Sequence, residues 1–187
     1  MKRVPSAHDS LLVLTIGHST RPIAEFIRLL QANTVTHLVD VRTIPKSRYN
    51  PQYHQPALEH SLKEAGIAYT HLATLGGLRH ASPDSVNTGW RNTSFRGYAD
   101  YMQTPKFEEG LETLIQLARE DRIALMCAEA VPWRCHRSLI EDALSVRGIR
   151  CEDIMNSGPR RAHTLTPFAH VSGTTITYPP EQVEMPI

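Results

Sequence analysis

Short apolar runs alternate with stretches of helical periodicity over residues 11–155 of the chain. The run Leu11–Ile16, closed by Gly17, is typical of a strand that is buried on both faces. Apolar residues then recur at helical spacing in Ile23–Ala32, which predicts a helix. The same alternation predicts further strands at His37–Val41, Ile67–Leu72, Arg122–Cys127 and Arg150–Met155, and further helices at Pro56–Ala65, Tyr98–Met102, Thr104–Ala118 and Arg134–Val146.

Strands that alternate with helices predict right-handed crossovers and a parallel sheet covered on both faces. We therefore expect an α/β protein with a layered, Rossmann-like fold and a mainly parallel sheet of about five strands. The order of the strands stays open. Residues 1–158 are expected to form a single α/β domain, followed by a C-terminal extension at residues 159–187 that is extended or partly ordered.

Composition and charge narrow the class of protein. The 187 residues are 41% hydrophobic and 21% charged, which is ordinary for one globular domain. The net charge of +1 provides no general basic surface for nucleic acid, so an anionic ligand needs local arginines. Residues 1–10 lack the apolar core of a signal peptide, and no apolar run approaches the roughly 20 residues of a membrane span. Three cysteines, an odd number, argue against a disulfide framework, and a cytoplasmic protein is expected.

Ionisable residues and glycines follow the ends of several predicted strands. In open parallel sheets, ligands bind beyond the carboxyl ends of the strands, so these residues are expected to share one edge. The candidates for substrate binding are His18, Ser19, Arg42, Gly76, Gly77, Arg79, Tyr98, Arg134 and Arg137. The candidates for catalysis are Asp40, Cys127, Glu129 and His136.

Several of these residues lie in segments that resemble one known family. The segments are Thr15–Ser19, Val39–Arg42, Leu75–Arg79, Phe95–Ala99 and Met126–Glu129, closed by Cys135–Arg137. Over about residues 11–158 the chain resembles the family called domain of unknown function 488. The resemblance implies a compact α/β fold and this set of residues, but no settled reaction.

The catalytic candidates each have two interpretations. Cys127 is either a small buried side chain at a strand end or a thiolate nucleophile close to His136 and the arginines. Glu129 is either paired with an arginine or acts as a general acid or base, and the sequence favours the second because it follows a buried strand. Asp40 either orients Arg42 or His18, or activates water.

The arginines and aromatic residues also have structural alternatives. Several arginines at one edge, beside a helix start, suit a phosphate or carboxylate, although each one alone is an ordinary surface charge. Aromatic residues such as Tyr98, in or after the long loop Ala73–Arg96, either pack that loop or stack on a planar ligand. The spacing of Cys127, Cys135 and His136 does not match a usual zinc site. No metal and no other cofactor is therefore predicted.

The preferred hypothesis is an enzyme that cleaves a bond in an anionic, nucleotide-like or nucleic-acid substrate, such as a hydrolase of the base-excision or DNA-repair type. One alternative is a transferase or hydrolase that uses Cys127 as a thiolate, with His136 as its base. Another is a non-catalytic module that binds a nucleotide or a metal. The expected partner is a small-molecule or nucleic-acid anion, and no binding to a membrane is expected.

Overall fold

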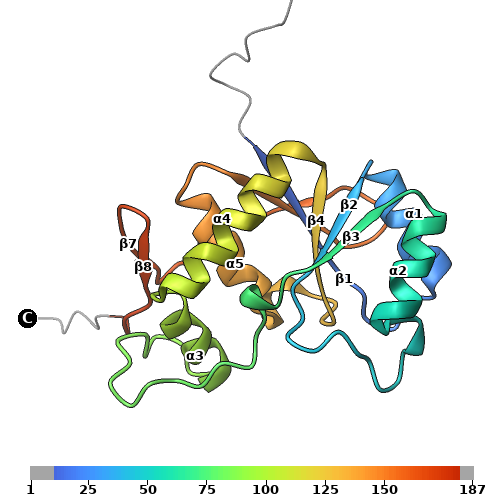
Figure 1. Cartoon of the computed structure of the whole chain (residues 1–187). Helices are drawn as coiled ribbons and strands as arrows, with labels where there is room; N and C mark the ends of the chain where they lie inside the picture. Colours follow the sequence, from blue (N-terminus) through green and yellow to red (C-terminus); the bar gives the residue numbers. More distant parts are fainter. Residues whose placement is uncertain (1–10, 182–187) are drawn as a thin grey trace, which may run out of the picture.

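A six-stranded sheet runs through the centre of the molecule (Figure 1). The computed structural model describes residues 11–181. Residues 1–10, where the sequence has no signal-peptide core, and residues 182–187, the end of the predicted extension, lie outside the described part. The strands of the sheet are β1 (Leu12–Gly17), β2 (His37–Asp40), β3 (Ala68–His71), β4 (Ile123–Cys127), β5 (Arg150–Ile154) and β6 (Arg161–Ala162).

The strands follow the order β3-β2-β4-β1-β5-β6. All neighbouring pairs are parallel except β5 and β6, which are antiparallel. The predicted α/β fold with a mainly parallel sheet is confirmed. The sheet has one strand more than the central five because β6 pairs with β5 at the edge.

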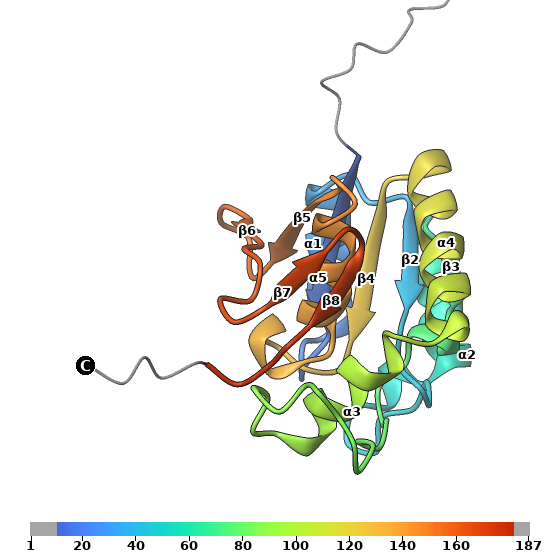
Figure 2. The same ribbon diagram turned by 90° about the vertical axis from the view of Figure 1, so that its left-hand side faces the viewer.

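The described residues form five α-helices, which are α1 (Ile23–Ala32), α2 (Gln55–Glu64), α3 (Thr93–Tyr101), α4 (Pro105–Glu120) and α5 (Arg137–Ser145). Helices α1 and α2 cover one face of the sheet, α4 and α5 cover the other, and α3 lies beyond one end of the strands (Figures 1 and 2). Three short 3-10 turns are η1 (Pro51–Tyr53), η2 (Ala73–Leu75) and η3 (Pro132–Arg134). The arrowheads of β2 and β4 point toward the edge of the sheet where α3 lies (Figure 2), so the loops after these strands meet there.

Alternate residues of each strand enter different layers of the core, because successive side chains of a strand point to opposite faces. In β4, Leu125 and Cys127 pack on the face that α4 and α5 cover, whereas Met126 packs on the face that α1 and α2 cover. This alternation places Cys127 on the same side of the sheet as the start of α5.

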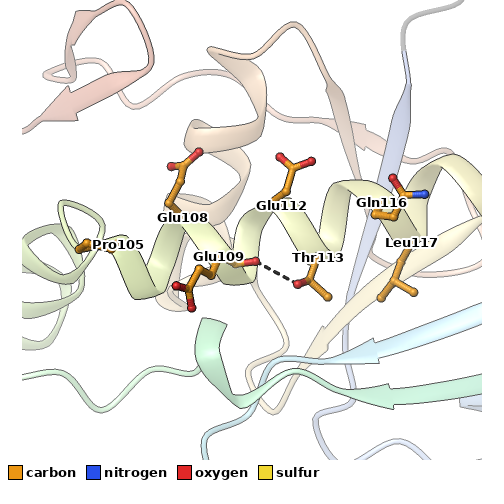
Figure 3. Close-up of a pocket in the computed structure, with 7 residues that line it drawn as sticks. All are labelled: Pro105, Glu108, Glu109, Glu112, Thr113, Gln116 and Leu117. Carbon is orange, nitrogen blue, oxygen red and sulfur yellow. Dashed lines mark hydrogen bonds between the residues drawn. The ribbon is translucent and has the colours of Figure 1, made fainter.

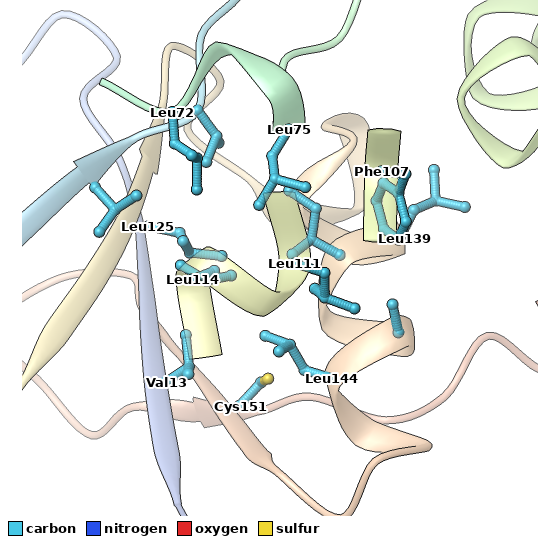
Figure 4. Packing of buried hydrophobic residues seen from close by; sticks show 14 of the residues in the cluster. Val13, Leu72, Leu75, Phe107, Leu111, Leu114, Leu125, Leu139, Leu144 and Cys151 are labelled. Atoms are coloured by element: carbon cyan, nitrogen blue, oxygen red, sulfur yellow. The ribbon is translucent and has the colours of Figure 1, made fainter. Parts of the chain in front are cut away.

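Helix α4 shows how one amphipathic element serves both core and surface. Its outer face borders a groove of 800 Å³ with Glu108, Glu109 and Glu112 at its wall (Figure 3). Its inner face contributes Leu111 and Leu114 to the larger core cluster (Figure 4). Burying two such leucines contributes roughly 3–6 kcal/mol relative to exposing them.

The C-terminal segment forms the short strands β7 (His170–Ser172) and β8 (Thr175–Thr177) on the side of the sheet that α5 covers (Figures 1 and 2). One buried carboxylate anchors this segment. Asp142 of α5 accepts hydrogen bonds from the His163 ring (2.8 Å), the Thr166 amide (3.1 Å) and the Tyr178 hydroxyl (2.8 Å). Three partners on one buried carboxylate offset its cost of desolvation.

The same segment holds the long loop that precedes α3. The amide of Tyr178 donates to the Asn87 side chain, and the Gly89 amide donates to the Tyr178 carbonyl. Trp90 packs against both Phe168 and Tyr178. The loop is therefore tied to the C-terminal segment near the carboxyl edge of the sheet. Over residues 11–181, no helix combines the length and the apolar composition that a membrane crossing requires.

Candidate functional site

The ends of β1 and β4 are joined by backbone hydrogen bonds that continue past the strands. The His18 amide donates to the Cys127 carbonyl (2.9 Å), and the Ser19 amide donates to the Ala128 carbonyl (3.0 Å). Gly17 makes this approach possible, because a Cβ atom there would lie 1.8 Å from the Glu129 carbonyl oxygen. The backbone around Cys127 is thus held in place from the neighbouring strand.

Two free cysteines meet at this edge. The Sγ atoms of Cys127 and Cys135 lie 2.7 Å apart, and both residues are at least 96% buried. Cys127 ends β4, and the turn η3 carries the chain back over the strand end, where the Cys135 amide donates to the Pro132 carbonyl (3.0 Å). The separation is short enough for one thiol to donate a hydrogen bond to the other sulfur.

The surroundings of the two sulfurs push their pKa values in opposite directions. Burial alone would raise the pKa of Cys135. However, the hydrogen bond from Cys127, the His136 ring and the Arg137 guanidinium lower it well below its ordinary value. Burial, followed by the hydrogen bond to Cys135, raises the pKa of Cys127. The arrangement therefore favours a thiolate on Cys135, stabilised by a thiol on Cys127.

Arg137, the first residue of α5, lies beneath the sulfur pair. Its guanidinium donates to the Thr15 hydroxyl (2.9 Å) and to the Glu129 carbonyl (2.9 Å), and the residue is 99% buried. Burial alone would lower the pKa of Arg137, but the sulfurs of Cys127 and Cys135 raise it. Arg137 is thus a fixed cation, and its charge favours the thiolate form of Cys135.

His136 stands beside Cys135 and contacts the loop of Gly77. Its Nδ1 lies 3.7 Å from the Cys135 sulfur, and its Nε2 lies 3.3 Å from the Val41 carbonyl oxygen. A protonated ring would donate at both positions, which is the geometry of a thiolate–imidazolium pair. A Cβ atom on Gly77 would lie 3.1 Å from this ring, so the glycine lets the loop approach the histidine.

Two adjoining pockets open over Cys135 and His136. They share Gly77, Leu78, Glu129, Cys135 and His136. The first, which we call the Lys46 pocket, has a volume of 260 Å³ and adds Arg42, Thr43, Ile44, Lys46, Cys127 and Ala128. The second, the Arg134 pocket, has a volume of 330 Å³ and adds Asn92, Ser94, Phe95, Tyr98 and Arg134. The exposed Lys46 therefore lines one pocket and the exposed Arg134 lines the other, so that each pocket has an exposed cation.

Asp40 and Arg42 satisfy one another at the end of β2. The Arg42 guanidinium donates to both Asp40 oxygens (2.9 and 2.7 Å), and the Tyr69 hydroxyl also donates to Asp40 (2.6 Å). The pair is almost fully buried. Asp40 thus orients the Arg42 side chain, and Arg42 also lines the Lys46 pocket.

His18 lies behind this pair. Its ring stacks on Tyr53 with 4.0 Å between centroids, and Nδ1 lies 2.8 Å from the Ser19 carbonyl oxygen. Burial lowers the pKa of His18 to about 4, so the ring is neutral near pH 7. With Nδ1 donating to Ser19, Nε2 is free to accept from Arg42 at 3.4 Å. His18 and Ser19 do not line either pocket.

The remaining predicted residues, Glu129 for catalysis and Arg79, Tyr98 and Gly76 for binding, have different surroundings. Glu129 is exposed at the rim of both pockets, because the chain leaves the sheet after Cys127. Arg79 stacks on the Tyr101 ring at 3.6 Å and donates to the Gly76 carbonyl, and it lines neither pocket. Tyr98 is buried beside His136 and donates to the Leu75 carbonyl (2.8 Å). Gly76 packs tightly against Thr43, where a Cβ atom would clash at 2.5 Å.

The sequence did not single out Cys135 as a catalytic candidate, and it gave no indication of the polar group formed by Thr15, Glu141 and Asp153. Thr15 donates to Asp153 and accepts from Arg137, and Glu141 lies buried beside Asp153. A usable signal was the alternation in β4, which puts Cys127 on the face where the next helix must pack. The polar Thr15 within the apolar β1 was the second signal, since buried polar groups need partners.

The remaining candidates for a site are weaker. Within residues 11–181, no group of three or more His, Cys, Asp or Glu side chains is arranged to hold a metal ion. The 800 Å³ groove on α4 is the largest hollow of the three discussed here, but one helix face lines it, without a cation or a nucleophile (Figure 3). The cysteine pair and its two pockets are therefore the best candidate for chemistry.

Comparisons with known proteins place the chain in a family without adding a reaction. The family described as "Domain of unknown function DUF488" matches residues 22–144, which is more than half of the chain. The match lies inside the region where the motifs resembled that family. No curated protein and no solved structure matches the chain.

Proposed function

Because this chain belongs to the DUF488 family, whose description assigns no reaction, we propose a function from the site itself: a cysteine-thiolate hydrolase or transferase acting on an anionic, nucleotide-like substrate. The observation that carries the proposal is the sulfur pair, in which the Sγ atoms of Cys127 and Cys135 lie 2.7 Å apart, with the His136 ring 3.7 Å from the Cys135 sulfur. A stabilised thiolate in a pocket is the usual form of a cysteine nucleophile.

The reaction has two steps. The Cys135 sulfur forms a bond to the electrophilic atom of the substrate, and the bond to the leaving group breaks. His136, as an imidazolium, gives its proton to the departing group. In the second step water attacks the intermediate, Glu129 accepts a proton from that water, and the thiolate is released. Replacing water by another acceptor makes the same enzyme a transferase.

The substrate class rests on the two pockets. Lys46 lines one pocket and Arg134 lines the other, and neither forms an ion pair with any residue in the range 11–181. The Arg134 pocket also has aromatic walls from Phe95 and Tyr98, and its 330 Å³ suits a small ligand. An anion with a planar group fits these walls, which keeps a nucleotide or a short single-stranded nucleic acid as the first substrates to test. The three free cysteines fit a reducing compartment, so we place the enzyme in the cytoplasm.

A second candidate uses the carboxylate without the sulfur. Glu129 lines both pockets, and no described residue is paired with its carboxylate, so it could activate water directly against the substrate. In that case Cys135→Ser would keep its turnover, whereas Glu129→Gln would lose at least about a hundredfold.

The test begins with the thiolate and then follows turnover. Iodoacetamide at mildly acidic pH should modify Cys135 first, and peptide mapping should show Cys127 and Cys151 reacting at least about tenfold more slowly. Nucleotides, nucleosides and short single-stranded DNA are then screened for turnover, with Cys135→Ser expected to be inactive. Equal reactivity of the three thiols, together with an active Cys135→Ser variant, would overturn the thiolate mechanism.

A further inference from the structure

We propose that Cys127 and Cys135 form a thiol–disulfide exchange centre, in which Cys127 resolves adducts on Cys135 and the partner is a small, carboxylate-bearing disulfide. The inference rests on the proposed Cys135 nucleophile but assigns Cys127 a reaction of its own. The two Sγ atoms lie 2.7 Å apart without a covalent bond, so a small movement brings them to bonding distance.

The exchange consists of two successive nucleophilic attacks, each by a cysteine sulfur on a disulfide bond. The Cys135 thiolate attacks one sulfur of the disulfide R–S–S–R, that bond breaks, and RS⁻ leaves. Cys127 then attacks the Cys135 sulfur of the mixed disulfide, its proton passes to the departing second RS⁻, and the Cys127–Cys135 bond forms. One external disulfide is reduced to two thiols while the protein pair is oxidised.

The site separates the two sulfurs into an attacking and a resolving group. Cys135 lines both pockets and accepts a hydrogen bond from the Arg137 amide (3.5 Å), whereas Cys127 lines only the Lys46 pocket. Arg137 donates to the Glu129 carbonyl at 2.9 Å, which ties the start of α5 to the chain that follows β4. Lys46 and Arg134 are positioned to hold the carboxylates of the small disulfide on both sides of Cys135.

The third cysteine provides an internal control. Cys151 lies on β5, lines neither pocket, and burial raises its pKa above the ordinary value. It has no sulfur partner among the described residues. Cys151→Ser should therefore behave like the unchanged protein in every assay of exchange.

Oxidised glutathione is the probe, with intact mass and peptide mapping as the readout. The unchanged protein should lose the mass of two hydrogen atoms and release two glutathione thiols. Cys127→Ser should stop at one glutathione bound to Cys135, and Cys135→Ser should react at least about tenfold more slowly. Replacing Lys46 and Arg134 by Ala should slow the reaction with glutathione but not the reaction with the neutral 2-hydroxyethyl disulfide.

The outcomes distinguish the two proposals. If Cys135 alkylates rapidly but Cys127→Ser takes up no glutathione, or the unchanged protein keeps a stable adduct, the exchange centre is refuted and the nucleophile stands. If Cys135 does not alkylate faster than Cys151, the nucleophile fails and the exchange centre fails with it. Circular dichroism of each variant is the control that separates a loss of exchange activity from unfolding.

Discussion

Replacing Arg137 by Met should destabilise the protein and weaken the Cys135 thiolate together. Arg137 is 99% buried and donates to Thr15 and to the Glu129 carbonyl, both at 2.9 Å. Hydrogen bonds to a charged group are worth about 1.5–3 kcal/mol each. Removing one partner from a buried charge network costs about 3–5 kcal/mol, because the other groups remain unpaired. The methionine recovers part of the apolar packing, so we expect a loss of about 3 kcal/mol in the free energy of unfolding.

Urea unfolding at neutral pH measures this loss, with the slope checked for two-state behaviour. Arg119→Met is the matched control, because Arg119 is exposed on α4 and its side chain donates a long hydrogen bond to Gln116 (3.5 Å). Its effect should stay within about 0.5 kcal/mol. Arg137→Lys should fall between the two, since lysine keeps the charge but cannot donate as a planar fork.

The second readout is the pH dependence of alkylation. Without the Arg137 cation, the pKa of Cys135 rises, so the thiolate fraction at mildly acidic pH falls and alkylation slows. An Arg137→Met protein that unfolds within about 1 kcal/mol of the unchanged chain and alkylates at the same rate would refute the assignment of a neutralising role.

Further variants test the geometry around the site. Gly17→Ala should lower the free energy of unfolding by at least about 3 kcal/mol, because its Cβ would lie 1.8 Å from the Glu129 carbonyl oxygen. The control Gly158→Ala should lower it by less than about 1 kcal/mol, because the new Cβ would meet only the movable Asn156 side chain. Equal urea midpoints for the two variants would contradict this. Burial, and then the neighbouring Asp153, raise the pKa of Glu141 in the folded protein. The contribution of the protonated Glu141 to stability is therefore fully present below pH 4.5, the pKa in the unfolded chain, and it is lost as the pH rises through the folded pKa. Glu141→Gln should therefore gain stability over the unchanged protein between about pH 5 and about pH 8 in urea unfolding, and a constant difference would count against the shared burial of the two acids. Tyr178→Phe should lower the free energy of unfolding by about 1–3 kcal/mol, because Asp142 loses one of its three hydrogen-bond donors. The variant should also be cleaved faster by a protease in the long loop that precedes α3. An unchanged cleavage rate would show that this hydrogen bond is dispensable.

The sequence by itself predicted the central sheet and the edge at which the candidate residues gather. Apolar runs of strand length separated by stretches of helical periodicity predict a parallel sheet, and the hydrophobic effect enforces that pattern locally. The strand ends at Gly17, Asp40 and Cys127 are visible from where each run stops. The motifs on those ends also pointed to the DUF488 family.

Only the tertiary structure decided which of these residues work together. Asp40 is bound by Arg42 and Tyr69, Glu129 turns outward, and Cys135 rather than Cys127 has the environment of a thiolate. The sixth strand joined the sheet at its edge, beyond the reach of the periodicity that predicted the other five. These outcomes depend on the path of the loop between β4 and α5 and on contacts between residues far apart in the chain, such as Thr15 with Arg137. Local periodicity specifies the face on which a side chain lies. The charged groups that surround it there come from residues far apart in the sequence, so they depend on the tertiary packing.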